Sequence, residues 1–143
     1  MNRQEIFDKA YLAILQQGRP SIGNMQENGN MQCLYRGRRG AKCAIGHLIP
    51  DDLYQPDIEN RSPYVLLQPQ EIDDAKQAVF RLILNKIFPD AGKLDVEFLH
   101  DLQEAHDKAA PAFLLNDFLP TFKARAEEVA LAYGLTIPSE PCQ

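Results

Sequence analysis

The side chains most able to do chemistry are two thiols and an imidazole, those of Cys33, Cys43 and His47. Cys43 and His47 are four residues apart, so a helical turn would place the thiol and the imidazole on one face. A Cys–His pair can activate the sulfur for acyl or thiol chemistry. No third, orienting group can be identified from the spacing. The alternative is that Cys43 is a small core residue, because free Cys is among the most buried residue types.

The same three residues, Cys33, Cys43 and His47, are candidate metal ligands, and His100 or His106 could add a fourth. Their chemical types suit zinc. Structural zinc sites usually show two close pairs such as Cys-x-x-Cys, and that spacing is absent here. We therefore predict no metal and no cofactor.

A second polar cluster falls in a predicted helix, where His100, Glu104 and Asp107 are spaced at i, i+4 and i+7. A histidine beside carboxylates can do acid–base work, and a solvated helix face is the alternative. His106 is nearer the apolar side of this helix and could be a hydrogen-bonded core histidine.

Positive charge gathers in one short segment of an otherwise acidic chain. The net charge is −5, and residues 50–107 hold 13 acidic against five basic residues, whereas residues 32–49 contain no acid. Cations beside an aromatic ring can recognise phosphate or carboxylate groups. We therefore predict partner binding by the basic residues of this segment and the neighbouring tyrosine: Tyr35, Arg36, Arg38, Arg39 and Lys42.

The pattern predicts an α+β fold, mostly helical with four to five helices and one β-hairpin near residues 32–45. Asn2 and Glu5 form a capping-box pattern before the first helix, and Gly18 ends it. Further helices are expected at 69–88, 95–109 and 111–133, the last kinked or split by Pro120. We predict a single domain over residues 1–143, with a flexible loop at 19–31 and a frayed tail at 138–143.

A longer pattern overlaps these candidates: Cys-x-Tyr-Arg-Gly from Cys33, then Cys-Ala-Ile-Gly-x-Leu-Ile-Pro-Asp from Cys43. Leu102-Gln103, His106-Asp107 and Tyr133-Gly134-Leu135 continue it. The sequence resembles a family of small uncharacterised proteins of bacteriophages and prophages. That family has no assigned activity, so the resemblance implies a phage or prophage origin and no chemistry.

We therefore expect a phage-derived accessory protein that binds a host or phage protein and inhibits it, a host-defence component being one target class. The first alternative is a small enzyme or ligand-binding module that uses Cys43 and His47. The second is an accessory factor that binds nucleic acid through the basic hairpin, against the overall negative charge. The odd cysteine count without a secretory leader predicts a cytoplasmic protein, and no apolar run suits a membrane. The sequence does not indicate an oligomeric state.

Overall fold

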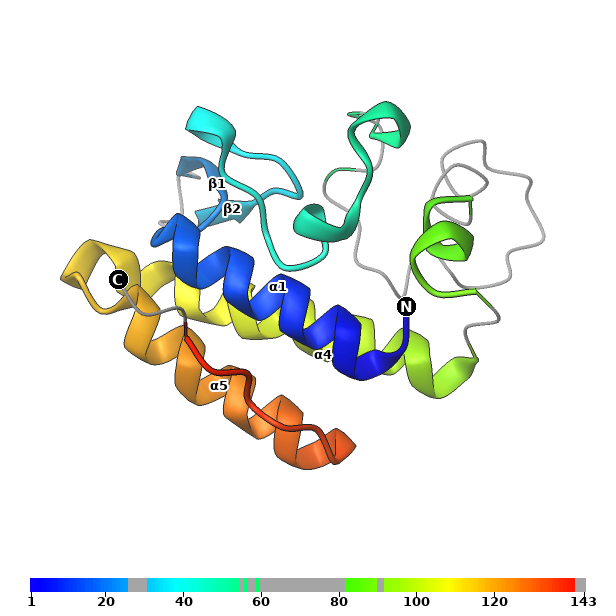
Figure 1. Cartoon of the computed structure of the whole chain (residues 1–143). Coiled ribbons are helices and arrows are strands. Elements are labelled where there is room, and N and C mark those ends of the chain that lie inside the picture. Colours follow the sequence, from blue (N-terminus) through cyan, green and yellow to red (C-terminus); the bar gives the residue numbers. More distant parts are fainter. Residues whose placement is uncertain (26–30, 55, 57–58, 60–81, 90–91, 141–143) are drawn as a thin grey trace.

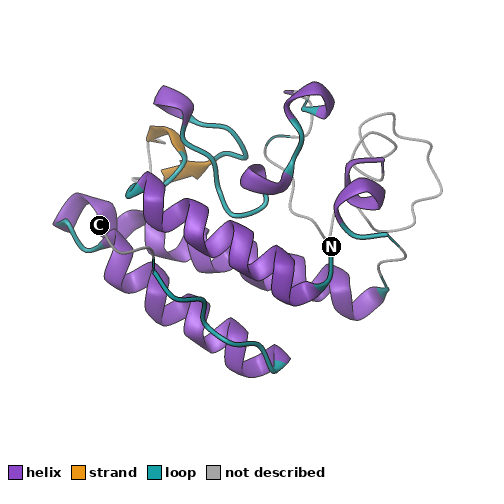
Figure 2. Ribbon diagram, in the orientation of Figure 1, coloured by secondary structure: helices purple, strands orange, loops and turns teal. Residues whose placement is uncertain are grey.

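Helices dominate the computed structural model of the chain. It describes residues 1–25, 31–54, 56, 59, 82–89 and 92–140. Its long helices are α1 (Arg3–Gln17), α4 (Lys93–Ala109) and α5 (Phe118–Tyr133), which run alongside one another in Figure 1. The strands are short and lie at one end of the helices (Figure 2). The mostly helical fold that the sequence predicts is therefore confirmed. No helix among the described residues is long and apolar enough to cross a membrane.

The first helix begins and ends where its capping residues predict. The Asn2 side chain accepts the Glu5 N–H at 2.8 Å, and the Glu5 carboxylate accepts the Asn2 N–H at 3.2 Å. These reciprocal bonds satisfy amides that the helix itself leaves without partners. Gly18 adopts a left-handed conformation, φ 75°, and its N–H donates to the Ile14 carbonyl.

The later helices differ from the prediction at their ends. The helix expected at 69–88 lies mostly outside the described residues, and 82–87 are helical. α4 begins at Lys93, two residues before the predicted start, because the Asp95 carboxylate caps the Gly92 N–H at 2.8 Å. The helix expected at 111–133 is split into the 3-10 helix η5 (Ala110–Leu115) and α5.

The split comes before Pro120 and not at it. Asn116 adopts a left-handed conformation, φ 56°, which asparagine tolerates better than most residues. Pro120 is the third residue of α5, in the first turn, where a backbone N–H has no partner within the helix. Proline is therefore compatible with this position, and Asn116 is the residue that ends η5.

The strands pair differently from the prediction. β1 (Ile22–Met25) pairs antiparallel with β2 (Met31–Cys33), so these parts of the expected 19–31 loop are strand. The expected β-hairpin over 32–45 is not formed, and only the isolated bridge Arg36↔Lys42 joins its two halves. The reason is that the segment before β2, and not the segment after it, supplies the backbone partners: Leu34 N–H, for example, donates to Ser21 O.

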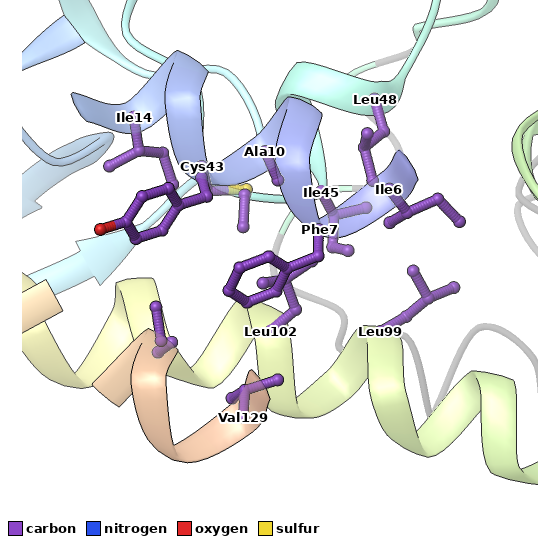
Figure 3. Close-up of a cluster of buried hydrophobic side chains, with 14 of the residues drawn as sticks. Ile6, Phe7, Ala10, Ile14, Cys43, Ile45, Leu48, Leu99, Leu102 and Val129 are labelled. Atoms are coloured by element: carbon purple, nitrogen blue, oxygen red, sulfur yellow. The ribbon is translucent and has the colours of Figure 1, made fainter. Parts of the chain in front are cut away.

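The core lies between α1, α4 and α5, and buried side chains of the segment Cys43–Ile49 join it. Figure 3 shows Cys43, Ile45 and Leu48 of this segment beside α1. Figure 3 shows Phe7 of α1 pointing toward Leu102 of α4. The chain end also packs on the helices: Gln4 bonds Thr136, and Lys123 contacts Glu140 at 2.6 Å. Of the predicted frayed tail, residues 138–140 are described and include this exposed ion pair, while 141–143 lie outside the described residues. The fully buried large side chains of the core include Ile6, Phe7, Ile14, Ile45, Ile83, Phe98, Leu102, His106 and Phe122.

Candidate functional site

The carboxylate of Asp107 on α4 is the centre of a partly buried hydrogen-bond network, here called the Asp107 network. Its Oδ1 accepts from Gln103 Nε2 at 2.8 Å and is 2.9 Å from His106 Nδ1. His106 is fully buried, and its Nε2 accepts the Ser21 backbone N–H at 2.9 Å. Because a neutral imidazole has one N–H and one lone pair, Nδ1 carries the proton and donates it to Asp107.

Gln103 extends the Asp107 network to the loop at Cys43–Gly46. Its Oε1 accepts the buried Ile45 N–H at 3.1 Å, and the Gly46 N–H donates to the Cys43 sulfur at 3.3 Å. Gly46 has no space for a side chain, since a Cβ atom there would lie 1.9 Å from the Tyr35 carbonyl oxygen. The Ile45–Gln103 hydrogen bond thus joins two parts of the Cys-Ala-Ile-Gly and Leu-Gln pattern that are 58 positions apart in the sequence.

Cys43, the predicted nucleophile candidate, has no exposed surface. Burial and the nearby Asp107 raise the pKa of its thiol well above the ordinary value. A buried, protonated thiol is a poor nucleophile, because the thiolate is the reactive form. The environment therefore favours the interpretation of Cys43 as a core residue.

His47, the proposed partner of Cys43, is joined to it through the backbone. The His47 N–H donates to the Cys43 carbonyl at 3.0 Å, while the ring Nε2 is buried with no hydrogen-bond partner in the described part of the chain. Burial, followed by the charge of Lys42, lowers the pKa of His47 to about 4. The ring is therefore neutral at pH 7. The hydrogen bond that the Cys43 sulfur accepts comes from the Gly46 N–H and not from this ring.

Cys33 lies beside His106 and Asp107, not with Cys43 and His47. The ligand atoms of Cys33, His106 and Asp107 are all within 4.8 Å of one another, and among the described residues this is the group close enough to hold a metal ion. The Cys33 thiol donates weakly to the Asp107 carbonyl at 3.9 Å. The predicted ligand set of Cys33, Cys43 and His47 is not brought together.

Cys33, His106 and Asp107 have the residue types of a catalytic triad but not its hydrogen bonds. Burial, with the negative charge of Asp107, raises the pKa of the Cys33 thiol to about 12. His106 Nε2, which would have to accept the thiol proton, already accepts the Ser21 amide. A general base must be free to bond the proton that it removes, so this arrangement does not activate Cys33.

The basic segment forms a compact turn, residues 36–42, here called the basic turn. Arg36 contacts Asp51 at 2.7 Å, donates to the Ile49 carbonyl at 3.1 Å and lies 4.5 Å above the Tyr54 ring. Lys42 is 3.5 Å from the same Asp51 carboxylate. Two of the four predicted cations are therefore paired with an acid of the chain itself.

Tyr35, also predicted to contact a partner, is buried and 5% exposed. Its backbone N–H and that of Arg36 donate to the two oxygens of Glu59, at 2.7 and 3.2 Å. The Tyr54 hydroxyl donates to the same carboxylate at 2.7 Å. Burial, followed by this hydrogen bond, raises the pKa of Tyr54 to about 12. Glu59 was not identified from the sequence, because an acid in a Pro-rich connection gives no local signal of the amides it caps.

Arg38 and Arg39 are the exposed cations of the basic turn. Arg39 adopts a left-handed conformation, φ 57°, and Gly40 follows with φ 74°. The turn is held by Arg19, whose guanidinium donates to the carbonyls of Arg38 and Arg39 at 3.1 and 2.5 Å. Arg19 lies outside the basic segment, so the run of cations does not indicate its role.

A groove of about 230 Å³ between α4 and α5 carries charges of both signs, many of them already paired. Tyr133 donates to Asp101 at 2.7 Å, and Lys108 contacts Glu104 at 3.2 Å. With three acidic and two basic residues, the groove has only a small excess of negative charge, which does not indicate a ligand class.

Comparison with known proteins gives no relative: no protein-family model, no curated protein and no solved structure matches this chain.

Proposed function

We propose that this chain is a small accessory protein that docks on an acidic surface of another protein through its basic turn and modulates that protein. The observation that carries this proposal is the presence of two exposed arginines, Arg38 and Arg39, on a turn fixed by the rest of the fold. Arginine is well suited to binding carboxylates, because its planar guanidinium can donate two parallel hydrogen bonds.

The order of the turn supports binding, because a pre-organised site loses little conformational entropy when a partner docks. The Gly37 N–H donates to the Ala41 carbonyl at 2.8 Å, and the Ser21 hydroxyl bonds the same carbonyl at 3.2 Å. The left-handed Arg39 is also a conformation that costs free energy in a non-glycine residue. An exposed arginine kept in this conformation is consistent with a recognition role.

A protein partner fits the charge distribution better than nucleic acid. Nucleic-acid binding proteins usually neutralise several phosphates with clustered cations, whereas Arg36 and Lys42 are committed to Asp51. The net charge of −5 would also repel a polyanion. A phage or prophage origin, and inhibition of a host-defence protein, remain the subclass that the family resemblance suggests.

The test is capture of partners from a nuclease-treated bacterial lysate, comparing the tagged protein with the double variant Arg38→Ala/Arg39→Ala. The matched control is Lys86→Ala/Lys108→Ala, which removes the same two charges from exposed positions elsewhere. We expect the wild type and the control to retain a protein that the arginine variant loses.

Three outcomes would count against the proposal. A partner that stays bound to the arginine variant would exclude the basic turn as its docking site. A partner captured from an untreated lysate but not from the nuclease-treated one would support the nucleic-acid alternative instead. Equal loss in the lysine control would show that net charge matters and that the turn does not.

A further inference from the structure

Three side chains of types that can ligate metals, from two elements, meet at the edge of the Asp107 network. Cys33 ends β2, while His106 and Asp107 are neighbours on α4, and their ligand atoms lie within 4.8 Å of one another. We propose that Cys33, His106 and Asp107 form a binding site for a transition-metal ion, zinc being the ion that the ligands fit best.

The choice of zinc follows from the ligand types. A thiolate, an imidazole nitrogen and a carboxylate oxygen are the three protein ligands that zinc accepts most readily. Calcium and magnesium prefer all-oxygen sites, which the sulfur and nitrogen ligands rule out. Three protein ligands would leave one tetrahedral position for water.

The surroundings provide both access and support. His106 is fully buried, whereas the Asp107 side chain is 30% exposed and Cys33 is half-buried, so an ion could enter from the side of these two residues. Gln103 Nε2 bonds Asp107 Oδ1 at 2.8 Å and orients the carboxylate. Such outer hydrogen bonds are a regular part of metal sites in proteins.

To bind the metal, Cys33 must lose its thiol proton and His106 must give up a hydrogen bond. The Cys33 thiol releases its proton to solvent and binds as the thiolate. His106 now uses Nδ1 toward Asp107 and Nε2 toward the Ser21 amide, so one of these hydrogen bonds must be replaced by the metal–nitrogen bond. Ligation through Nε2 gives up the Ser21 bond and leaves Nδ1–H donating to Asp107, whereas ligation through Nδ1 moves the ring proton to Nε2 and gives up both bonds. The weak bond from the Cys33 thiol to the Asp107 carbonyl is lost in either case, and three metal–ligand bonds are gained.

The first experiment titrates the chelator-treated full-length protein with zinc chloride in a calorimeter, and with cobalt(II) in an absorption spectrometer. We expect one ion per chain and a thiolate-to-cobalt charge-transfer band. Cys33→Ser and Asp107→Asn should each weaken zinc by more than about 100-fold, since loss of an outer partner alone costs 10–100-fold. His47→Gln is the matched control and should bind normally, which separates this site from the set Cys33, Cys43 and His47.

A second readout needs no variant. Zinc should protect Cys33 from iodoacetamide, measured by peptide mass spectrometry under conditions that modify it in the zinc-free protein. Absence of stoichiometric zinc binding, a cobalt band that persists in Cys33→Ser, or unchanged alkylation of Cys33 would each overturn the proposal. The Arg38→Ala/Arg39→Ala protein should bind zinc normally, so failure of this site and failure of the basic turn are distinguishable.

Discussion

Replacing Gln103 by leucine should destabilise the protein through the hydrogen bonds that it removes. Gln103 is 7% exposed, accepts the buried Ile45 N–H at 3.1 Å and donates to Asp107 at 2.8 Å. Leucine has a similar volume, so the change leaves little cavity and mainly deprives these two groups of a partner.

The expected loss follows from these two groups. A buried donor or acceptor without a partner costs about 1–3 kcal/mol. Ile45 is 2% exposed, so its N–H should bear the full cost, whereas Asp107 is partly exposed and can turn to water. The free energy of unfolding should therefore fall by about 2–4 kcal/mol.

Urea unfolding followed by circular dichroism measures this loss, with the slope of free energy against urea compared between variants. The matched control is Gln16→Leu, which makes the same change at an exposed position of α1 and should alter stability by less than about 0.5 kcal/mol. A Gln103→Leu protein as stable as the control, with an unchanged slope, would refute the view that Gln103 clamps the Cys43–Gly46 loop onto α4.

Three further predictions concern the same region. Folding lowers the pKa of His47 from 6.5 to about 4, so the unfolded chain binds more protons than the folded chain between these pH values. The stability that His47 contributes should therefore be fully present above pH 6.5 and be lost as the pH falls toward 4. Urea unfolding at several pH values should show this slope, and His47→Gln should flatten it; an unchanged slope would contradict the assignment. Gly46→Ala should destabilise the protein by more than about 2 kcal/mol, because its Cβ would overlap the Tyr35 carbonyl. Gly40→Ala is the control, with open space and only the cost of its positive φ, about 1 kcal/mol, so equal losses would show that the overlap is relieved. Finally, iodoacetamide should modify Cys43 far more slowly in the folded protein than in denaturant, and equal rates would show that its burial is not maintained.

Local signals were sufficient to predict the first helix and the amphipathic α4. The Asn2–Glu5 capping box and the left-handed Gly18 involve only residues within a few positions of each helix end. The β-hairpin prediction was wrong, because glycines around Arg38-Arg39 indicate a turn but not which strand pairs with β2. That choice depends on contacts such as Leu34 N–H to Ser21 O, between residues that are 13 positions apart in the sequence.

For the candidate sites too, local patterns could be predicted from the sequence, whereas contacts between distant segments could not. The basic turn could be predicted from the run of cations, but not that Asp51 pairs with two of these cations or that Glu59 and Arg19 bond the backbone of the turn. The grouping of Cys33 with His106 and Asp107 depends on how β2 packs on α4, which spacing along the chain does not encode.

The central claim, that the basic turn docks on an acidic protein surface, is tested most directly by the affinity of a purified captured partner. Biolayer interferometry would compare the wild type, Arg38→Ala/Arg39→Ala and Lys86→Ala/Lys108→Ala at low and at moderate salt. We predict that the arginine variant binds about tenfold or more weakly, as expected when interface arginines are truncated, that the lysine control binds like the wild type, and that salt weakens the wild type. Equal affinities for all three proteins would contradict the account.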